Sequence, residues 1–110
     1  MKLPNRDKAF IPRNKLVKYL LSETHPIGST KARFLNSVGY NRINFVELEK
    51  ALLKIAQTND VKSVRKLEYG INYVIDGSME TPSRKKVTIT TVWFIKVETN
   101  KPSFVTAYPV

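Results

Sequence analysis

One short segment combines a residue that titrates near neutral pH with a lysine at the start of an expected helix. His25 is the only histidine of the chain and lies in the turn-like run 24–29, which contains Pro26 and Gly28. Lys31 follows six residues later. An imidazole can give or take a proton at neutral pH, and a helix N-terminus beside a lysine attracts an anion such as phosphate. The segment is therefore either part of a site for acid–base chemistry on a phosphate or an ordinary capping turn.

Metal-free cleavage of RNA needs few groups, and the chain has residues of each required type. The RNA 2′-OH attacks its own phosphate, so the enzyme needs an acid or base, cations for the phosphorane charge and groups that clamp the backbone. His25 and Lys31 supply the first two, and Thr91, Thr106 and Tyr108 add hydroxyl groups if their strands pair. Each residue also has a structural alternative: a satisfied turn for His25, a solvated helix position for Lys31 and simple β-propensity for the other three.

Basic residues form a second group of candidates. The chain has 19 Lys and Arg against nine Asp and Glu, a net charge of +10, which favours a polyanionic partner. The residues expected to line a phosphate track lie before the sheet and in a hairpin: Lys62, Arg65, Lys66, Arg84, Lys85 and Lys86. The alternative for both runs is a solvated surface.

Other chemistries have little support in the sequence. The absence of cysteine excludes disulfides, zinc–thiolate sites and thiol nucleophiles. The acidic residues are scattered, and Asp76 and Glu80, the one pair that suggests a magnesium site, are more simply turn residues. We expect no metal and no small-molecule cofactor. We also expect no membrane partner and a cytoplasmic location, because no apolar run is long enough to span a bilayer and residues 1–7 do not resemble a signal peptide.

The elements that must position these residues follow from the change in hydrophobic period. Helical spacing predicts helices at about 15–22, from Ser29 or Thr30 to Val38, and from a capping-box-like Asn44 to about Gln57. After residue 60 the period becomes two, which predicts strands at 71–75, 87–97 and 104–108, with 61–67 either a further strand or an irregular lead-in. Asp76-Gly77 is expected to end the first of these strands, and 78–86 to be a loop.

Helices followed by strands with short connections indicate an α+β fold. We expect a single domain over 1–110, with an extended arm at 1–12, a helical part at 13–58 and an antiparallel sheet of three to four strands at 61–108. The helices should pack on one face of this sheet, leaving the other face free to meet a ligand.

A series of short motifs runs along the chain in a fixed order: Lys8-Ala9, Lys15-Leu16, Tyr19-Leu20-Leu21, His25-Pro26-x-Gly28-x-x-Lys31-Ala32-x-Phe34, Gly39, Gly70-x-x-Tyr73-Val74-Ile75-Asp76-Gly77, Thr91-Val92-Trp93 and Pro102-x-x-Val105-Thr106-Ala107-Tyr108-Pro109. Together these motifs resemble an uncharacterised bacterial domain family found as small stand-alone proteins and as C-terminal tips of polymorphic toxins. They span nearly the whole chain. The loop at 81–86 departs from the family pattern, because such sequences usually have a second glycine turn there.

The layout is also similar to the barnase–EndoU–colicin–RelE group of metal-independent ribonuclease toxins. By that resemblance His25, Lys31, Thr91, Thr106 and Tyr108 would be site residues. The substrate would be RNA, with transfer RNA as one candidate, and the protein partner would be an acidic antitoxin or immunity protein. His25 would act as general acid or base, Lys31 would stabilise phosphate charge, and Thr106 and Thr91 would orient the phosphate.

Two other functions remain open from the sequence. The first is a basic nucleic-acid-binding module without catalysis, and the second is a basic interaction protein paired with an acidic partner. Unlike these two alternatives, the ribonuclease hypothesis requires particular residues to lie close together in the fold. His25, Lys31, Thr91 and Thr106 must meet within about the reach of one phosphate.

Overall fold

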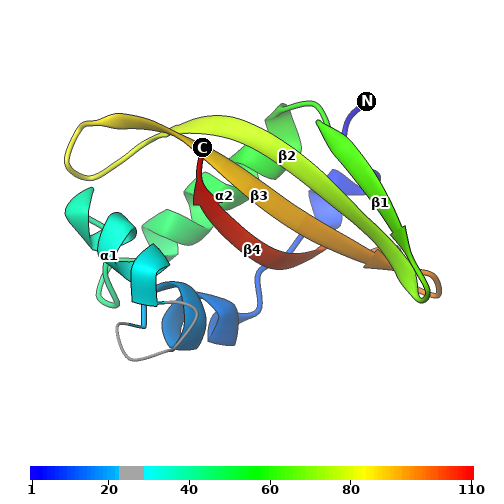
Figure 1. Cartoon of the computed structure of the whole chain (residues 1–110), viewed down its shortest axis with the longest axis horizontal. Helices are drawn as coiled ribbons and strands as arrows, with labels where there is room; N and C mark the ends of the chain where they lie inside the picture. The colour runs from blue at the N-terminus through cyan, green and yellow to red at the C-terminus, as the bar shows by residue number, and fades with distance from the viewer. Residues whose placement is uncertain (23–28) are drawn as a thin grey trace.

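The chain forms an α+β structure in which the helical elements precede a four-stranded antiparallel sheet (Figure 1). The computed structural model describes residues 1–22 and 29–110. Its elements are η1 (Arg6–Lys8), η2 (Lys15–Leu20), α1 (Ser29–Ser37), α2 (Phe45–Thr58), β1 (Ser63–Leu67), β2 (Gly70–Glu80), β3 (Lys86–Lys96) and β4 (Ser103–Pro109). The strands lie in chain order, β1-β2-β3-β4, and the basic segment that precedes the sheet is itself the edge strand β1.

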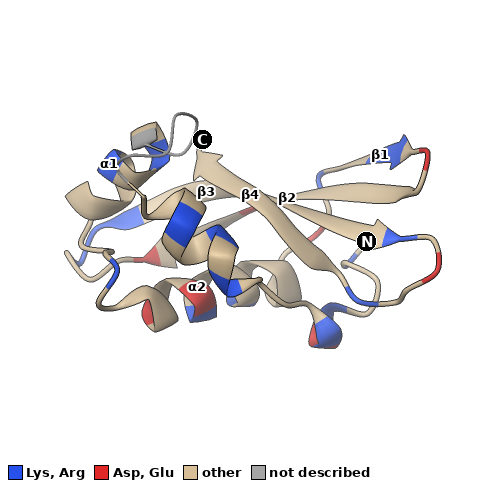
Figure 2. Ribbon diagram, turned by 90° about the horizontal axis from the view of Figure 1, so that it is seen from below, with Lys and Arg blue, Asp and Glu red and all other residues tan. Residues whose placement is uncertain are grey.

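The core lies between α2 and one face of the sheet, and Figure 2 shows α2 as a separate layer beneath the strands. We call this face the covered face and the opposite one the open face. Trp93 of β3 is fully buried on the covered face and meets Phe104 of β4 edge-to-face, with ring centroids 5.3 Å apart. Leu52 and Ile55 of α2 belong to the same buried cluster. Among the described residues, no helix combines the length and apolar character needed to cross a membrane.

The first predicted helix is shorter and wider than expected. It is the π-type helix η2 over Lys15–Leu20, in which the Leu21 amide donates to the Leu16 carbonyl at 2.8 Å. Leu16 and Leu20 are buried, as the periodicity predicts. Tyr19, expected on the same apolar face, is only half-buried and reaches β4 instead. The π turn matters here because such turns are frequent at functional sites.

The prediction of a turn at Asp76-Gly77 was wrong, because β2 continues through both residues to Glu80. Gly77 has a different role. A Cβ at this position would lie 2.7 Å from the Asn59 side-chain nitrogen and 2.8 Å from Ile55 Cγ2. The glycine therefore lets the C-terminal end of α2 approach the strand, and sequence alone does not distinguish this use of glycine from a turn.

The β2–β3 connection is shorter than the predicted 78–86 loop and packs against the end of α1. Gly39 has φ +100°, which agrees with its predicted place just after the helix, and a Cβ there would lie 2.8 Å from Pro82 Cβ. The Ser83 amide also donates to the Val38 carbonyl at 3.1 Å. The departure from the family pattern at 81–86 is thus a loop that docks on the helical layer.

The predicted capping box of α2 is absent. The helix begins at Phe45, but the Asn44 side chain makes no cap hydrogen bond. Its Oδ1 accepts from the Asn41 amide at 2.8 Å, and its Nδ2 donates to the Gly39 carbonyl at 2.8 Å. Asn44 therefore ties the α1–α2 connection together, and the helix start is satisfied by the backbone bond from the Glu47 amide to the Asn44 carbonyl.

Candidate functional site

A β-bulge in β4 decides which of its side chains can reach a ligand. Trp93 pairs with Phe104 and Val92 pairs with Thr106, so β4 has one extra residue, Val105, between these pairs. Residues two apart normally share a face, but here Phe104 is buried in the core and Thr106 is turned to the open face. The bulge therefore lets one short strand both fill the core and present a hydroxyl group outside it.

Thr106 meets residues of two helical elements at the β4 edge. Its Oγ1 lies 3.1 Å from the Tyr19 hydroxyl, and either oxygen can be the donor. Lys31 Nζ, from the first turns of α1, lies 5.6 Å from the Tyr19 ring centroid, and Lys15 Nζ lies 5.4 Å from it. We call these four residues the Tyr19 cluster. It joins two hydroxyl groups and two cations from three separate elements.

The electrostatics of the cluster favour negative charge. Burial by itself raises the pKa of Tyr19, but the hydrogen bonds from Thr106 and Lys31 and the charges of Lys31 and Lys15 outweigh it, so the pKa lies below the usual tyrosine value. An environment that stabilises a phenolate also stabilises other anionic oxygens, including those of a phosphate. The cluster is therefore suited to bind an anion.

The predicted convergence of four residues can be compared with the structure for three of them. His25 lies outside the described residues. Lys31 and Thr106 are brought together through their shared contacts with Tyr19. Thr91 lies elsewhere, because it is fully buried on the covered face.

The Thr91 hydroxyl is occupied by two internal hydrogen bonds. It donates to the Ile75 carbonyl at 2.8 Å and accepts from Trp93 Nε1 at 2.8 Å. A buried indole N–H needs such an acceptor, so the structure gives Thr91 a role in the core. Its one donor is therefore used inside the core, and the fully buried side chain has no exposed surface with which to orient a phosphate.

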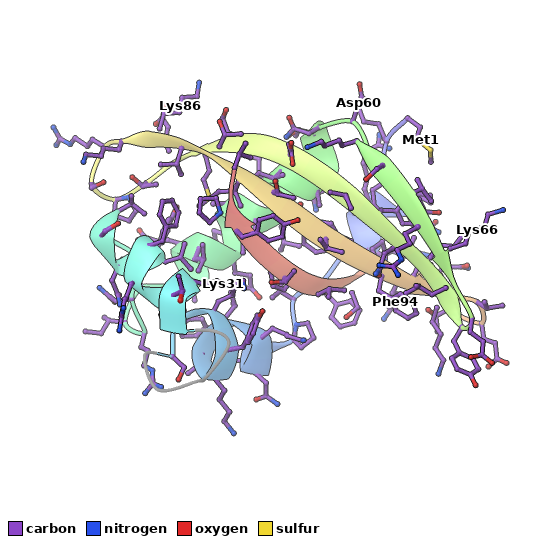
Figure 3. The ribbon with its side chains drawn as sticks, viewed as in Figure 1. Met1, Lys31, Asp60, Lys66, Lys86 and Phe94 are labelled. Carbon is purple, nitrogen blue, oxygen red and sulfur yellow. The ribbon has the colours of Figure 1, made fainter. Side chains whose placement is uncertain are left out.

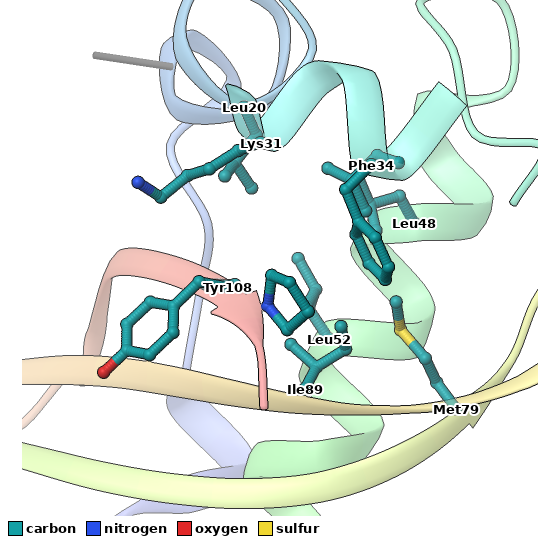
Figure 4. Close-up of a pocket in the computed structure, with 11 residues that line it drawn as sticks. Leu20, Lys31, Phe34, Leu48, Leu52, Met79, Ile89 and Tyr108 are labelled. Carbon is teal, nitrogen blue, oxygen red and sulfur yellow. The ribbon is translucent and has the colours of Figure 1, made fainter. Parts of the chain in front are cut away.

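Tyr108 of β4 and Lys31 of α1 both line a small apolar gap (Figure 4). It is 43% exposed and pairs with Thr90 at the end of β4. The gap between α1, α2 and the sheet has a cavity volume of about 10 Å³, enough for at most one water molecule. A ligand must therefore lie over the exposed rim formed by Lys31 and Tyr108 rather than inside this gap.

The six basic residues predicted to bind RNA do not form one continuous track on the sheet. Figure 3 shows Lys66 near one end and Lys86 near the other. All six are exposed: Lys62, Arg65, Lys66, Arg84, Lys85 and Lys86. Figure 2 also shows Lys and Arg spread over α1, β1 and the loops, so the positive charge surrounds the sheet rather than forming one block.

One acidic residue on the open face is already paired. Asp76 accepts from the Thr90 hydroxyl at 2.7 Å and lies 3.0 Å from Lys62 Nζ. The hydrogen bond from Thr90 is the main cause that holds the pKa of Asp76 below its usual value, with Lys62 adding to it against the effect of burial. In the described part of the chain, His, Cys, Asp and Glu residues nowhere gather in a group of three or more that could hold a metal ion.

Sequence reasoning placed Tyr19 only on a helix face and did not identify it as a site residue. A signal was present in the spacing, because Lys15 and Tyr19 are four residues apart and so share one side of a helical turn. What the spacing could not show is the partner across the fold, Thr106, which is 87 residues away in the sequence.

Comparison with known proteins places this arrangement in a family. The profile of a domain of unknown function, DUF6883, matches residues 2–110. The chain belongs to this family. No curated protein sequence matches this DUF6883 domain. Its fold is similar to that of one chain of a contact-dependent growth inhibition toxin–immunity protein complex from Klebsiella pneumoniae 342, with a TM-score of 0.74, 16% identity and coverage of 92% of this chain and 99% of that chain. At this identity the similarity shows a shared fold.

Proposed function

We propose that this protein is a metal-independent ribonuclease toxin whose active site includes the Tyr19 cluster. The observation that carries the proposal is the contact between the Tyr19 and Thr106 hydroxyl groups at 3.1 Å, with Lys31 beside them. Two N-terminal elements, η2 and α1, and the C-terminal strand β4 bring hydroxyl donors and cations to one partly exposed edge. These are the groups that stabilise a pentacovalent phosphate without a metal.

In the proposed reaction the RNA 2′-OH attacks the adjacent phosphorus and loses its proton to a general base. The bond from phosphorus to the 5′ oxygen breaks, and that oxygen takes a proton from a general acid, leaving a 2′,3′-cyclic phosphate and a 5′-OH end. His25 is the residue predicted from the sequence for this proton transfer. In this proposal Lys31 neutralises the phosphate oxygens, while Tyr19 and Thr106 donate hydrogen bonds to them.

The fold comparison supports a toxin and a protein partner. A chain with this fold occurs in a toxin–immunity protein complex, and the net charge of +10 complements an acidic inhibitor as well as RNA. We therefore propose RNA as substrate, an acidic immunity protein or antitoxin as partner, and the cytoplasm of the target cell as the place of action.

Incubation of the purified protein with total RNA, with and without a chelator, tests the activity directly. We expect cleavage in both conditions and cyclic phosphate ends. His25→Ala and Lys31→Met should each lower the cleavage rate by about 10²- to 10⁴-fold, the usual contribution of a positioned acid or base or of a charge-stabilising group. Lys18→Met is the matched control, because Lys18 is an exposed lysine on η2 outside the cluster. Cleavage that stops with the chelator, or that is unchanged in both site variants, would remove the proposal.

Binding of nucleic acid without cleavage is the second candidate function. The exposed basic residues on β1, Arg65 and Lys66, favour it because they lie away from the Tyr19 cluster and need no chemistry to contact phosphates. It predicts intact RNA, binding that weakens steeply with salt, and a larger effect from Arg65→Met than from His25→Ala.

A further inference from the structure

We propose that the groove between Phe10 and Phe94 is a subsite in which a base of single-stranded RNA stacks. We call it the Phe groove, and it is lined by Phe10, Phe94, Lys96, Thr99, Lys101 and Ser103. The choice of ligand rests on the proposed function. The site lies beyond the cleavage residues and would bind a nucleotide that flanks the reacting phosphate.

The groove has the size and composition for a planar apolar ligand with a charged backbone. Its volume of about 270 Å³ contrasts with the 10 Å³ of the gap beneath Lys31 and Tyr108, and both phenylalanines border it. Phe10 is 43% exposed, so its side chain is accessible to a ligand. Two aromatic rings at one open groove are the arrangement on which bases of single-stranded nucleic acids stack.

The position of the Phe94 ring is fixed by the neighbouring strand. A Cβ on Gly70 would lie 2.5 Å from Phe94 Cζ, so the ring lies directly over the glycine backbone of β2. An aromatic side chain that covers a glycine across two strands in this way is held in place by the sheet. The ring is therefore positioned before any ligand binds, which lowers the entropic cost of binding.

Phe10 is fixed through its backbone at the edge of β4. Its amide donates to the Pro102 carbonyl at 3.0 Å, and its carbonyl accepts from the Phe104 amide at 3.0 Å. These bonds extend the sheet by one parallel bridge, from Phe10 to Ser103. The N-terminal segment thus supplies the second wall of the groove.

The charges around the groove match a phosphate backbone. Lys96 and Lys101 are exposed and line it, and its lining includes no acidic residue. Arg65 lies in the same register row, since it pairs with Asn72 and Asn72 pairs with Phe94. Aromatic walls with cations at the rim favour a single-stranded nucleic acid over a purely apolar ligand.

The groove also adjoins the proposed cleavage site. Phe94 pairs with Ser103 and Val92 pairs with Thr106, so the two sites are two β3 residues apart, about 7 Å along the strand. The bulge at Val105 keeps Ser103 and Thr106 on the same open face. A phosphate at the Tyr19 cluster would therefore place an adjacent nucleotide at the Phe groove.

The test measures binding of a fluorescent single-stranded oligodeoxynucleotide, which lacks the attacking 2′-OH and is not cut by the proposed mechanism. Phe94→Leu keeps an apolar cover over Gly70 but removes the π face, and we expect it to weaken binding about 5- to 140-fold, the usual effect of losing one stacked base. Phe10→Leu should act in the same direction, and Phe94→Tyr should retain affinity. Lys96→Met should reduce the steepness with which the logarithm of the binding constant falls with the logarithm of the salt concentration, by about 0.7.

Tyr69→Leu is the matched control, because Tyr69 is an exposed aromatic residue in the β1–β2 turn and does not line the groove. Thermal melts of each variant separate lost binding from lost folding. Native affinity in folded Phe94→Leu and Phe10→Leu would overturn the inference. Failure of the native protein to bind the oligonucleotide at low salt would also overturn it and would point to an acidic protein as the occupant. Loss of binding in Phe94→Leu, together with no RNA cleavage by the native protein, would support the groove and reject only the ribonuclease proposal.

Discussion

The two faces of the sheet use the same residue type in opposite ways. Thr91 on the covered face is fully buried, and its hydroxyl both donates and accepts within the core. Thr106 on the open face is half-buried and shares its hydroxyl with Tyr19 beside two lysines. On the covered face a hydroxyl group completes the hydrogen bonding of the core, whereas at the open edge it remains close to solvent and to cations. The location of a threonine, more than its presence on a strand, decides whether it can meet a substrate.

Two tyrosines show the same contrast in their electrostatics. Burial raises the pKa of Tyr40, and the nearby charge of Glu47 raises it further. Tyr19 is also affected by burial, but Thr106, Lys31 and Lys15 together lower its pKa. The core side of the molecule disfavours a phenolate, while the β4 edge favours one.

Removing one aromatic ring from each face should give the largest difference in the free energy of unfolding between two variants. Trp93→Ala should lower the free energy of unfolding by about 3–5 kcal/mol, because it leaves a cavity and removes the buried hydrogen bond from the indole N–H to the Thr91 hydroxyl. Phe94→Ala on the open face should cost much less, since its ring is partly solvated. Urea unfolding of both variants measures the difference. Equal losses would show that the open face is as much a part of the core as the covered one.

The two threonines provide a smaller and more specific comparison. Thr91→Val should destabilise the fold by about 1–3 kcal/mol, because Trp93 Nε1 and the Ile75 carbonyl lose a buried partner. Thr106→Val should cost less than about 1 kcal/mol, since its hydroxyl is near solvent, but should reduce RNA cleavage. Chemical denaturation and a cleavage assay on the same samples test both claims. If Thr106→Val lost stability but kept full cleavage, the Thr106 hydroxyl would have a structural role and no role in the reaction, contrary to this prediction.

Acid titration tests the polar network on the open face. Because the pKa of Asp76 is lowered in the fold, its carboxylate stabilises the protein at neutral pH, and this contribution is lost as pH falls through the lowered pKa. Thr90→Val should raise that pKa more than Lys62→Met, because the Thr90 bond is the larger cause and Lys62 is exposed. The difference in the free energy of unfolding between Thr90→Val and the native protein should therefore become smaller at acidic pH. NMR titration of the carboxyl carbon in the three proteins gives the order directly, and a larger shift in Lys62→Met would contradict it.

The smallest expected effect is on the Tyr19 phenol. Lys31→Met should raise its pKa, because it removes both a hydrogen bond and a positive charge. Alkaline titration of tyrosinate absorbance, with Tyr19→Phe to identify the relevant step, measures the shift. Lys54→Met, which removes an exposed lysine from α2, should leave this step unchanged. A step that does not move in Lys31→Met would show that the lysine does not act on the phenol.

Much of the fold could be predicted because its signals are local. The periodicity indicated α2 closely, and the change from helical to alternating spacing indicated the sheet. The alternation also predicted that Ile89, Thr91 and Trp93 of β3 share one face, and all three are buried, although Thr90 on the opposite face is buried as well. A prediction failed where the same residue type can either form a turn or allow close packing. Gly77 was interpreted as a turn, but it accommodates the approach of α2.

The sequence by itself determined the α+β class, the strong positive charge, and the residue types available for phosphate chemistry, because composition and local periodicity are properties of the chain. Only the tertiary structure decided which hydroxyl groups reach the surface. The extra residue Val105 turns Thr106 away from the core face that Phe104 occupies, and η2 brings Tyr19 against it. A bulge and a contact between residues 87 positions apart depend on how strands and helices pack, and no local pattern encodes them. The same packing placed Thr91 in the core and Phe10 beside Phe94.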